Sequence, residues 1–482
     1  MSLSCRENRY IDLISPSNKM NAPPIYTMPL PGQKMYVITK PDLIQTVQKQ
    51  HKALAFEPIA AKFSTIVCGV TEATRAKVLQ NIYGDEPGPS LYEDSHVAMY
   101  GALKPGPDLD DMNRSMIHEV ASALDALGTE PRTINLNHYL RDMVTTATTR
   151  SVYGPLNPFD DKSISSAFWD FESGFMAIVA NILPSLLARK PVAAREKVAN
   201  AFIKYYQSGG VEQASVLARN RYTASITNHV PLQDLSRFEV GGSIAILVNT
   251  TPAVFWTLFL LHAHPGLRDS IRAEIDACTE TSTTPSNKTL KTISITTLKE
   301  ECPLLLSAYQ ETLRYCAIGT SVRQVVEDTY LSTYLLKKGA MLQMPSRVIH
   351  TDASLWGPSV SEFNPRRFLA SEKANRPKDT AFRSFGGGKT LCPGRHFATN
   401  EVLAVVAVFI ARFDMEPVDG EKGWEMPTCA NTNVAAVVME PDTDIGVRIE
   451  GREGFESVEW GVRLDSAGDK VFAMVTEDLG GE

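Results

Sequence analysis

The order of apolar and polar residues along this chain follows a helical period over most of its length. Before that tract, the stretch from Tyr26 has the pattern of two short strands joined by a turn on Pro31 and Gly32. A helix is expected to start near Pro41, followed by a long helical tract that proline and glycine clusters interrupt. These patterns predict a mainly α fold with a small β portion.

Two later segments depart from the helical period. The run from Cys278 to Thr297 is rich in serine and threonine, and we expect it to form an exposed loop. After Asp444 the apolar residues alternate, as at Trp460 and Val462, which indicates strands. We predict that this acidic tail forms a hairpin appended to the core.

Two apolar segments raise the question of a membrane. Ile244 to Leu261 has the 18 residues that a spanning helix needs. The polar and helix-breaking residues at its middle, which are costly in lipid, are Asn249, Thr250, Thr251 and Pro252. A buried central helix with a polar notch explains both features. Phe175 to Leu187 is shorter and contains Asn181 and Pro184, so it is either core or an apolar lip that dips into a membrane surface.

Composition narrows the classes of protein and of site. Of 482 residues, 43% are hydrophobic and 21% are charged, which is typical of a soluble globular protein. The formal net charge of -7 and the lack of a basic stripe argue against nucleic acid as a partner. Seven cysteines without a CxxC pair indicate a reducing compartment with no disulfide framework. Nine histidines without an HExxH motif argue against a zinc site.

The most informative motif is SFGGGKTLCPGRHFA at residues 384–398, which places Cys392 between a glycine-dense loop and a helix. Unpaired backbone N–H groups at the start of a helix favour negative charge and lower the pKa of a thiol there. The glycines Gly386–Gly388 let the backbone turn tightly against something flat and bulky, and Phe385 supplies an aromatic wall. A cysteine in this setting has the properties of an axial thiolate ligand of haem iron.

Two other interpretations compete with the haem ligand. The letters GGGKT resemble part of a phosphate-binding loop, but Arg383 stands where that loop needs a glycine. Cys392 could also be a buried structural cysteine, which is the usual fate of free cysteines. The flanking residues favour the haem ligand, because Phe385, Gly388, Cys392 and Gly394 have the spacing of a known pattern. The segment resembles the haem-binding loop of the cytochrome P450 family.

This resemblance implies a cytochrome P450-like fold with haem b buried between a long central helix and the helix after Cys392. Cys392 would ligate the iron, and Phe385, Gly388 and Gly394 would complete the loop around the cofactor. The resemblance also divides the chain into three parts. They are an N-terminal segment without a membrane anchor (1–25), a catalytic domain (26–450) and an acidic C-terminal extension (451–482).

The central helix carries the candidate catalytic residues. Pro252 has no N–H, so the carbonyl of Val248 loses its helical partner and the helix is expected to kink or open beside Asn249 and Thr250. In the resembled family the matching threonine guides protons to oxygen at the haem, usually after an Asp or Glu. Thr250 matches the threonine, while Asn249 replaces the acid. The alternative is a helix kink with ordinary capping side chains.

Three charged residues match a structural network. Glu311 and Arg314 are three residues apart on a helix predicted to start near Pro303, so they share a face and can pair. Arg367 follows in the segment EFNPRRF. In the resembled family the corresponding Glu, Arg and Arg form a buried network that holds the haem-binding core. A guanidinium that forks to one carboxylate and to nearby carbonyls satisfies such a buried charge.

The propionates of haem need cationic or hydroxyl partners. Arg323 matches a position that commonly binds a propionate in the resembled family, and Arg395 is a second candidate, although either could be a solvated surface arginine. Thr390 stands two residues before the cysteine, where the family usually has Arg or His. The family's Trp-x-x-x-Arg pair is not recognisable here, so haem anchoring is expected to use fewer cations.

The finer resemblance is to one branch of the family. Asn249–Pro252, Thr390 with the following CPGR, and AREKVANAF at 194–202 resemble the group of cholesterol 7α-hydroxylase and prostacyclin synthase, whose fungal members often modify sterol, terpenoid or alkaloid scaffolds. This implies a haem-thiolate monooxygenase in secondary-metabolite biosynthesis, supplied with electrons from NADPH through cytochrome P450 reductase. We expect an apolar, fairly large substrate, because no charged cluster is apparent near the predicted pocket.

Two other functions stay open. One is a haem-thiolate isomerase or dehydratase that rearranges a peroxide without activating oxygen, and the other is a haem-binding scaffold or sensor without turnover. Most eukaryotic family members begin with a membrane anchor, whereas residues 1–20 here are polar, without a signal-peptide core or spanning helix. The resemblance therefore implies a location on the cytoplasmic side of the endoplasmic reticulum, soluble or peripheral, with Phe175–Leu187 as the candidate membrane contact.

Overall fold

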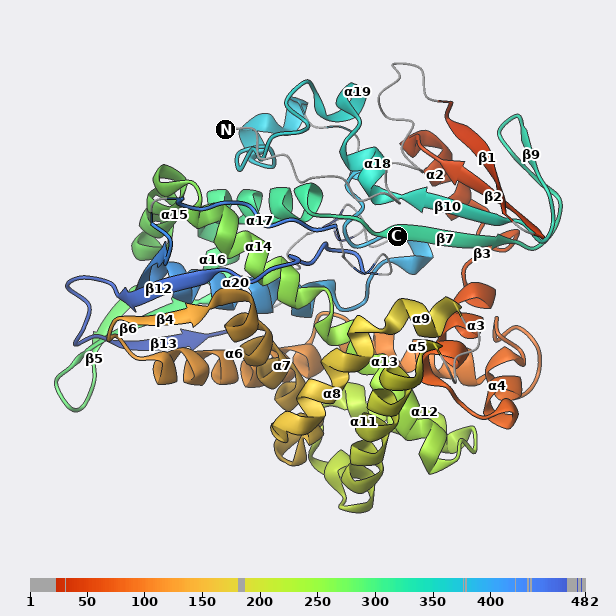
Figure 1. Cartoon of the computed structure of the whole chain (residues 1–482), viewed down its shortest axis with the longest axis horizontal. Helices are drawn as coiled ribbons and strands as arrows, with labels where there is room; N and C mark the ends of the chain where they lie inside the picture. Colours follow the sequence, from red (N-terminus) through yellow and green to blue (C-terminus); the bar gives the residue numbers. More distant parts are fainter. Residues whose placement is uncertain are drawn as a thin grey trace.

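Helices make up most of the molecule in the computed structural model, and small sheets lie at its two sides (Figure 1). This confirms the prediction of a mainly α fold with a small β portion. The structure describes residues 23–30, 32–180, 187–375, 377, 379–420, 422–430, 433, 436–465, 475 and 478.

The central helix lies in the middle of the molecule and is interrupted once. It consists of α13 (Leu232–Leu247) and α14 (Thr250–His262), separated by Val248 and Asn249 where Pro252 removes a backbone donor. All the residues of α14 are buried. The helices that it packs against include α7 (Leu136–Tyr153), α17 (Pro303–Tyr315) and α20 (Arg395–Arg412).

The apolar length of this element reflects burial in the protein core. Within the described part of the chain, Leu232–His262 is the one helical stretch long and apolar enough to cross a membrane, and 78% of its most apolar window is buried. The predicted buried central helix with a polar notch is therefore confirmed.

The other helices surround this core. In chain order they are α2 (Pro41–Lys49), α3 (Glu57–Cys68), α4 (Glu72–Leu79), α5 (Leu91–Leu103), α6 (Pro107–Leu127), α8 (Lys162–Ser173), α9 (Phe175–Ala180), α11 (Arg189–Gln207), α12 (Val216–Thr227), α15 (Pro265–Cys278), α16 (Ile295–Glu301), α18 (Ser346–His350) and α19 (Ala353–Trp356). Several begin as their sequences predict. Pro107 occupies the first turn of α6, and Ser215 caps α12 by accepting the N–H of Ala218.

The largest sheet contains the predicted N-terminal hairpin. Its strands in spatial order are β1 (Ile25–Leu30), β2 (Gln33–Ile38), β10 (Met341–Pro345), β7 (Thr320–Val325) and β3 (Leu54–Ala55). The antiparallel register of β1 and β2 pairs Ile25 with Ile38. Gly32 in the connecting turn has φ 72°, a conformation that favours glycine, and α2 begins at Pro41 as expected.

The prediction of an exposed loop at Cys278–Thr297 is wrong. This segment forms β5 (Glu280–Thr283), β6 (Thr289–Ser294) and the start of α16, with Asn287 at φ 59° in the turn between the strands. Threonine and isoleucine are β-branched and fit a pleated strand even when it is exposed, so polarity alone was misleading.

The C-terminal tail also differs from the predicted hairpin. Its strand β13 (Glu459–Arg463) pairs in parallel with β6, far away in sequence, instead of with a neighbouring strand. The expected second strand, at 471–475, lies mostly outside the described residues. The remaining strands are β4 (Arg132–Asn135), β8 (Thr329–Leu331), β9 (Tyr334–Leu336), β11 (Phe413–Pro417) and β12 (Gly446–Gly451).

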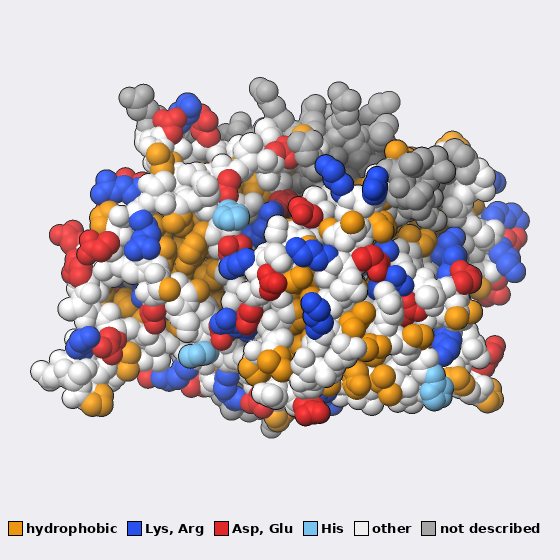
Figure 2. Space-filling model, turned by 60° about the horizontal axis from the view of Figure 1, so that its bottom comes forward, with side chains coloured by type: hydrophobic (Ala, Val, Ile, Leu, Met, Phe, Trp, Pro, Cys, Tyr) orange, Lys and Arg blue, Asp and Glu red, His pale blue; other side chains and the backbone are white. Residues whose placement is uncertain are grey.

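The segment proposed as core or membrane lip contributes both buried and exposed residues. Phe175 at the start of α9 is buried and packs against Phe63 of α3 with ring centroids 5.6 Å apart. Met176 and Leu187 are exposed by 42% and 65%, and residues 181–186 lie outside the described part. On the face shown in Figure 2, charges of both signs are interspersed, and hydrophobic side chains gather in the left centre and in the lower right of the view.

Candidate active site

A cavity of about 410 Å³ lies between the central helix and the loop that precedes α20. Most of the predicted site residues meet in its wall, although they come from distant parts of the chain. These are Asn249, Thr250, Arg323, Phe385, Thr390, Cys392 and Gly394. Gly388 and Arg395 are not among the described residues that line the cavity.

The loop before Cys392 is tightly folded. The N–H of Cys392 donates to the carbonyl of Phe385 at 2.9 Å, which closes the turn. Gly386 has φ 81°, and a Cβ there would lie 2.9 Å from the carbonyl oxygen of Thr390, so only glycine fits. Gly388, at φ 59°, packs against the side chain of Gln48 and therefore supports the loop from outside the cavity.

The thiol of Cys392 lies in a mixed electrostatic environment. Burial raises its pKa, whereas the backbone N–H of Gly394 and the charge of Arg395 lower it. The start of the helix thus acts on this pKa in the expected direction, but desolvation is the larger effect and raises the pKa in the protein chain alone. A metal ion bound to the sulfur would deprotonate the thiol outright.

The polar notch of the central helix opens onto the same cavity. Thr250 and Asn249 both line it. The side-chain oxygen of Asn249 accepts the N–H of Val437 at 2.8 Å. This hydrogen bond connects the break in the central helix to the segment that contains Val437. Thr251 does not line the cavity, and its hydroxyl donates to the carbonyl of Leu247. Thr250 is therefore the one of these two threonines that lines the cavity.

Arg323 presents a buried cation to the cavity. Its Nη2 donates to the hydroxyl of Thr390 at 2.7 Å and its Nη1 to the carbonyl of Val322 at 2.7 Å. Burial lowers its pKa to about 10, and no carboxylate of the described residues forms an ion pair with it. An arginine and a hydroxyl beside an apolar cavity with a cysteine fit a flat apolar ring that carries carboxylates, which is the chemistry of haem b.

Arg395 has other partners. Its Nε donates to Asp478 at 2.8 Å, and its Nη1 donates to the carbonyl of Cys392 at 3.1 Å. The guanidinium thus joins the C-terminal tail to the first turn of α20. The geometry therefore does not favour a propionate contact for Arg395.

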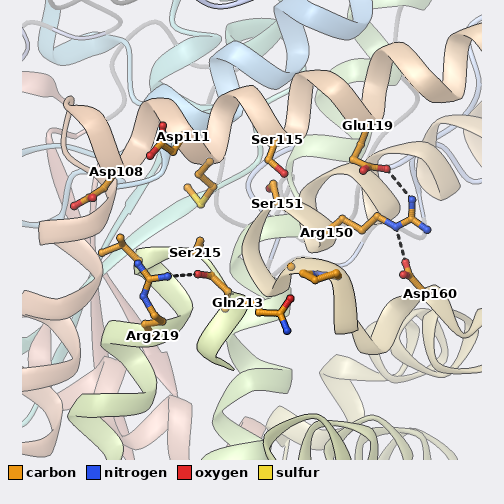
Figure 3. Close-up of a pocket in the computed structure, with 15 residues that line it drawn as sticks. Asp108, Asp111, Ser115, Glu119, Arg150, Ser151, Asp160, Gln213, Ser215 and Arg219 are labelled. Carbon is orange, nitrogen blue, oxygen red and sulfur yellow. Dashed lines mark hydrogen bonds and ion pairs between the residues drawn. The ribbon is translucent and has the colours of Figure 1, made fainter. Parts of the chain in front are cut away.

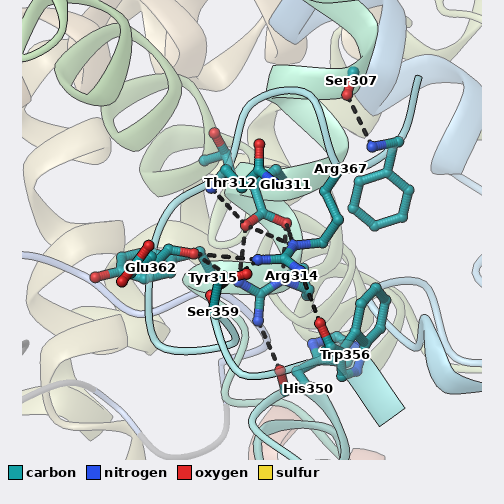
Figure 4. Close-up of polar contacts among 12 residues, drawn as sticks. Ser307, Glu311, Thr312, Arg314, Tyr315, His350, Trp356, Ser359, Glu362 and Arg367 are labelled. Carbon is teal, nitrogen blue, oxygen red and sulfur yellow. Dashed lines mark hydrogen bonds and ion pairs between the residues drawn. The ribbon is translucent and has the colours of Figure 1, made fainter. Parts of the chain in front are cut away.

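Glu311, Arg314 and Arg367 form a fully buried network (Figure 4). Arg314 donates through Nε and Nη2 to both oxygens of Glu311, each at 2.8 Å, and Arg367 Nε donates to the same carboxylate at 3.1 Å. The remaining donors bond to backbone carbonyls, including those of His350 and Trp356. One carboxylate thereby holds two guanidinium groups from separate segments.

This network is connected to the cysteine loop through one histidine. His350 accepts Arg314 at its carbonyl, and its Nε2 accepts the backbone N–H of Arg383 at 2.9 Å. Arg383 stands two residues before Phe385 and lines the cavity. Burial lowers the pKa of His350 well below its usual value, so its ring stays neutral and can accept this bond.

Sequence reasoning missed two arginines and one tyrosine at the site. Arg221 and Arg383 line the cavity together with Arg323, so its wall carries two cations that the sequence analysis did not name. Tyr100 of α5 donates to the carbonyl of Leu391 at 2.7 Å, directly before the cysteine. The position of Arg383 directly before the motif was a usable signal, whereas Arg221 and Tyr100 come from helices remote in the sequence, where no local pattern indicated the site.

A second cavity of about 660 Å³ lies between α6, the end of α7 and α12 (Figure 3). Most of its lining residues are polar, and Arg150 in its wall donates to both Glu119 and Asp160 at 2.8 Å. Met112 lines both this cavity and the one that contains Cys392. This second cavity differs from the candidate active site in its paired charges and because none of the described residues that line it is a cysteine.

Buried Glu401 on α20 leads to a prediction about pH. Burial raises its pKa to about 8, and its Oε1 accepts the hydroxyl of Thr148 at 2.6 Å. Between its ordinary pKa and this value, the folded state keeps a proton that the unfolded state loses. In this pH range, Glu401 should therefore lower the free energy of unfolding by about 1.4 kcal/mol for each pH unit by which the pH rises.

We expect Glu401→Gln to remove this contribution. The difference in melting temperature, variant minus wild type, should therefore increase steadily from pH 6 to pH 8. Glu416→Gln, at an exposed position, is the control and should follow wild type. Parallel melting curves for Glu401→Gln and wild type over this range would contradict the prediction.

Comparisons with known proteins agree with this geometry. The family model "Cytochrome P450" matches residues 244–443. A "Cytochrome P450 monooxygenase nodJ" of Hypoxylon pulicicidum is 33% identical over 461 residues, covering 94% of this chain and 87% of the relative. A "25-hydroxycholesterol 7-alpha-hydroxylase" of Rattus norvegicus is 26% identical over 434 residues, covering 85% and 98%.

A solved structure shows the same fold. The retinoic acid-bound cyanobacterial CYP120A1 superimposes with a TM-score of 0.68 and covers 89% of this chain and 92% of its own. Its sequence is 20% identical, so the likeness concerns the fold alone.

Proposed function

Because this chain belongs to the cytochrome P450 family and shares the branch of fungal monooxygenases and oxysterol 7α-hydroxylases, we propose that it is a haem-thiolate monooxygenase with Cys392 as the iron ligand. The observation that carries the proposal is the single cavity where Cys392, Thr250 and Arg323 meet. Haem b is the cofactor of the family, and when bound it supplies oxygen activation with electrons that come from a reductase.

The residues of the chain then have separate tasks. Arg323 and Thr390 would hold a propionate, since they share a 2.7 Å hydrogen bond at the cavity edge. Glu311, Arg314 and Arg367 would support the cysteine loop through His350. The hydroxyl of Thr250 would hold a water molecule and pass protons into the cavity. Asn249 would assist through its amide nitrogen, because its oxygen is engaged by Val437.

The test of the proposed function is the coupling of electrons to product in Thr250→Ala. This variant should bind haem and substrate nearly as wild type, but it should divert reducing equivalents to hydrogen peroxide. The measurement is product formed per NADPH consumed, with NADPH–cytochrome P450 reductase as the electron donor. We expect roughly a tenfold or larger loss in this ratio, since positioned proton transfer typically contributes 10²–10⁴-fold.

Thr251→Ala is the matched control, because its hydroxyl is tied to Leu247 and does not line the cavity. Its ratio should stay close to the wild-type value. Equal ratios for Thr250→Ala and wild type would remove the relay role. Product formation by wild type without any reductase would favour the second candidate, a peroxide-rearranging isomerase, with which Asn249 in place of an acid is compatible.

The relatives support a proposal about the substrate class. Their names include an oxysterol hydroxylase and fungal monooxygenases, and the cavity wall is largely apolar. We therefore propose a sterol-, terpenoid- or alkaloid-like substrate, oxidised in secondary metabolism. Contact with the endoplasmic reticulum membrane through Phe175–Leu187 belongs to the same proposal, supported by the exposure of Met176 and Leu187.

A further inference from the structure

Arg221 on α12 faces the cavity that also contains Cys392 and Thr250. It is the one polar side chain that the surrounding helices α5, α6, α7, α12 and α13 contribute to this wall within the described part of the chain. The other contributions are Met99, Leu103, Met112, Val152, Leu217, Gly242, Ala245 and Ile246. A cation in an otherwise apolar part of the wall is costly to bury unless it has a partner.

The guanidinium of Arg221 is held in place by α13. Its Nη2 lies 3.0 Å from Oε2 of Glu239, and the two side chains are exposed by only 11% and 3%. Tyr153 donates to the same carboxylate oxygen at 3.2 Å. A Cβ at Gly242 would lie 1.6 Å from Nη2, so the arginine rests directly on the backbone of the central helix and requires glycine there.

This arrangement leaves donors available to a ligand. Nη2 is engaged by Glu239 and, at 3.5 Å, by the carbonyl of Phe238, while neither Nε nor Nη1 donates to any residue that the structure describes. Donors that face a largely apolar cavity without an acceptor are unfavourable, so an acceptor on a bound molecule would be stabilising. Because Glu239 already balances the charge, a neutral oxygen fits better than a carboxylate, which would also face Glu239.

We infer that Arg221 anchors a hydroxyl or carbonyl oxygen at the far end of the substrate. The inference rests on the proposed function and refines its substrate class. Gly242 lies eight residues before Thr250 on the interrupted central helix, and eight residues of an unbroken helix span about 12 Å. The substrate is therefore an elongated, largely apolar molecule with one neutral oxygen function about that far from the position that is oxidised.

The test uses alkylimidazoles as probes, because their ring nitrogen binds haem iron whatever the natural substrate is. Each n-alkylimidazole is compared with its ω-hydroxy and ω-carboxy analogues of the same length, from short to long chains, by the Soret shift. In wild type, one chain length should show a gain in affinity on adding the hydroxyl. In Arg221→Met this gain should fall at least tenfold, as expected for a hydrogen bond to a charged group.

Arg219→Met is the matched control. It lies on the same helix, but its side chain is exposed and lines the second cavity (Figure 3), so the hydroxyl gain should persist. Arg221→Met with Glu239→Gln removes both charges and avoids leaving the carboxylate unpaired; it should lose the gain as well.

Equal hydroxyl effects in wild type and both Arg221 variants at every length would overturn the inference, and so would a stronger gain from the carboxylate than from the hydroxyl. Plain alkylimidazoles without a hydroxyl should shift the Soret band of wild type in any case. Their failure to do so would count against the proposed haem site itself, and the two failures are therefore distinguishable.

Discussion

Replacing Cys392 with alanine should abolish the thiolate-type Soret band of the reduced protein under carbon monoxide. The expected loss is complete, because Cys392 is the only cysteine among the described residues that lines the cavity. The surrounding loop cannot supply another soft, anionic ligand for iron. The measurement is the difference spectrum of purified protein, normalised to total haem.

Cys429→Ala is a suitable control, since Cys429 is also buried but lies away from the cavity wall. Its spectrum should match that of wild type. A normal thiolate-type band in Cys392→Ala would show that the cysteine is structural, and the whole assignment of the site would have to be abandoned.

Glu311→Ala should produce the largest loss of stability of any variant considered for this protein. The substitution leaves the guanidinium groups of Arg314 and Arg367 buried without their shared carboxylate, and the N–H of Asn364 also loses its acceptor. Breaking a buried ion network in this way typically costs about 3–5 kcal/mol. We expect a large drop in melting temperature and little haem-loaded protein.

The control for Glu311→Ala is an exposed ion pair. Asp419 lies 2.8 Å from Lys422, and both side chains are more than half exposed. Such pairs contribute about 0–1 kcal/mol, so Asp419→Ala should melt close to wild type. Full haem occupancy and unchanged melting in Glu311→Ala would contradict the supporting role of the network.

Local patterns in the sequence were sufficient to predict much of the site. The glycine-rich motif predicts the loop around Cys392, and Pro252 predicts the break in the central helix, because both depend on backbone constraints that single residues impose. The spacing of Glu311 and Arg314 predicts their pairing for the same reason, since three residues on a helix place side chains on one face.

Features that depend on tertiary contact were not predictable in this way. Arg221 reaches the cavity only because α12 packs where Gly242 leaves room, and nothing near Arg221 in the sequence indicates this. Arg395 looked like a propionate ligand, but its carboxylate partner Asp478 comes from the C-terminal tail. The threonine-rich β5 and β6 were misjudged because polarity does not distinguish a loop from an exposed strand.

The parallel pairing of β13 with β6 has a consequence for how the chain folds during synthesis. Strand β6 is made long before Glu459–Arg463 leaves the ribosome, and until then one of its edges has no partner. Unpaired strand edges are templates for pairing with other chains. A premature stop before residue 459 would therefore leave a permanently open edge, and the shortened protein is expected to aggregate even though Cys392 and the central helix are intact.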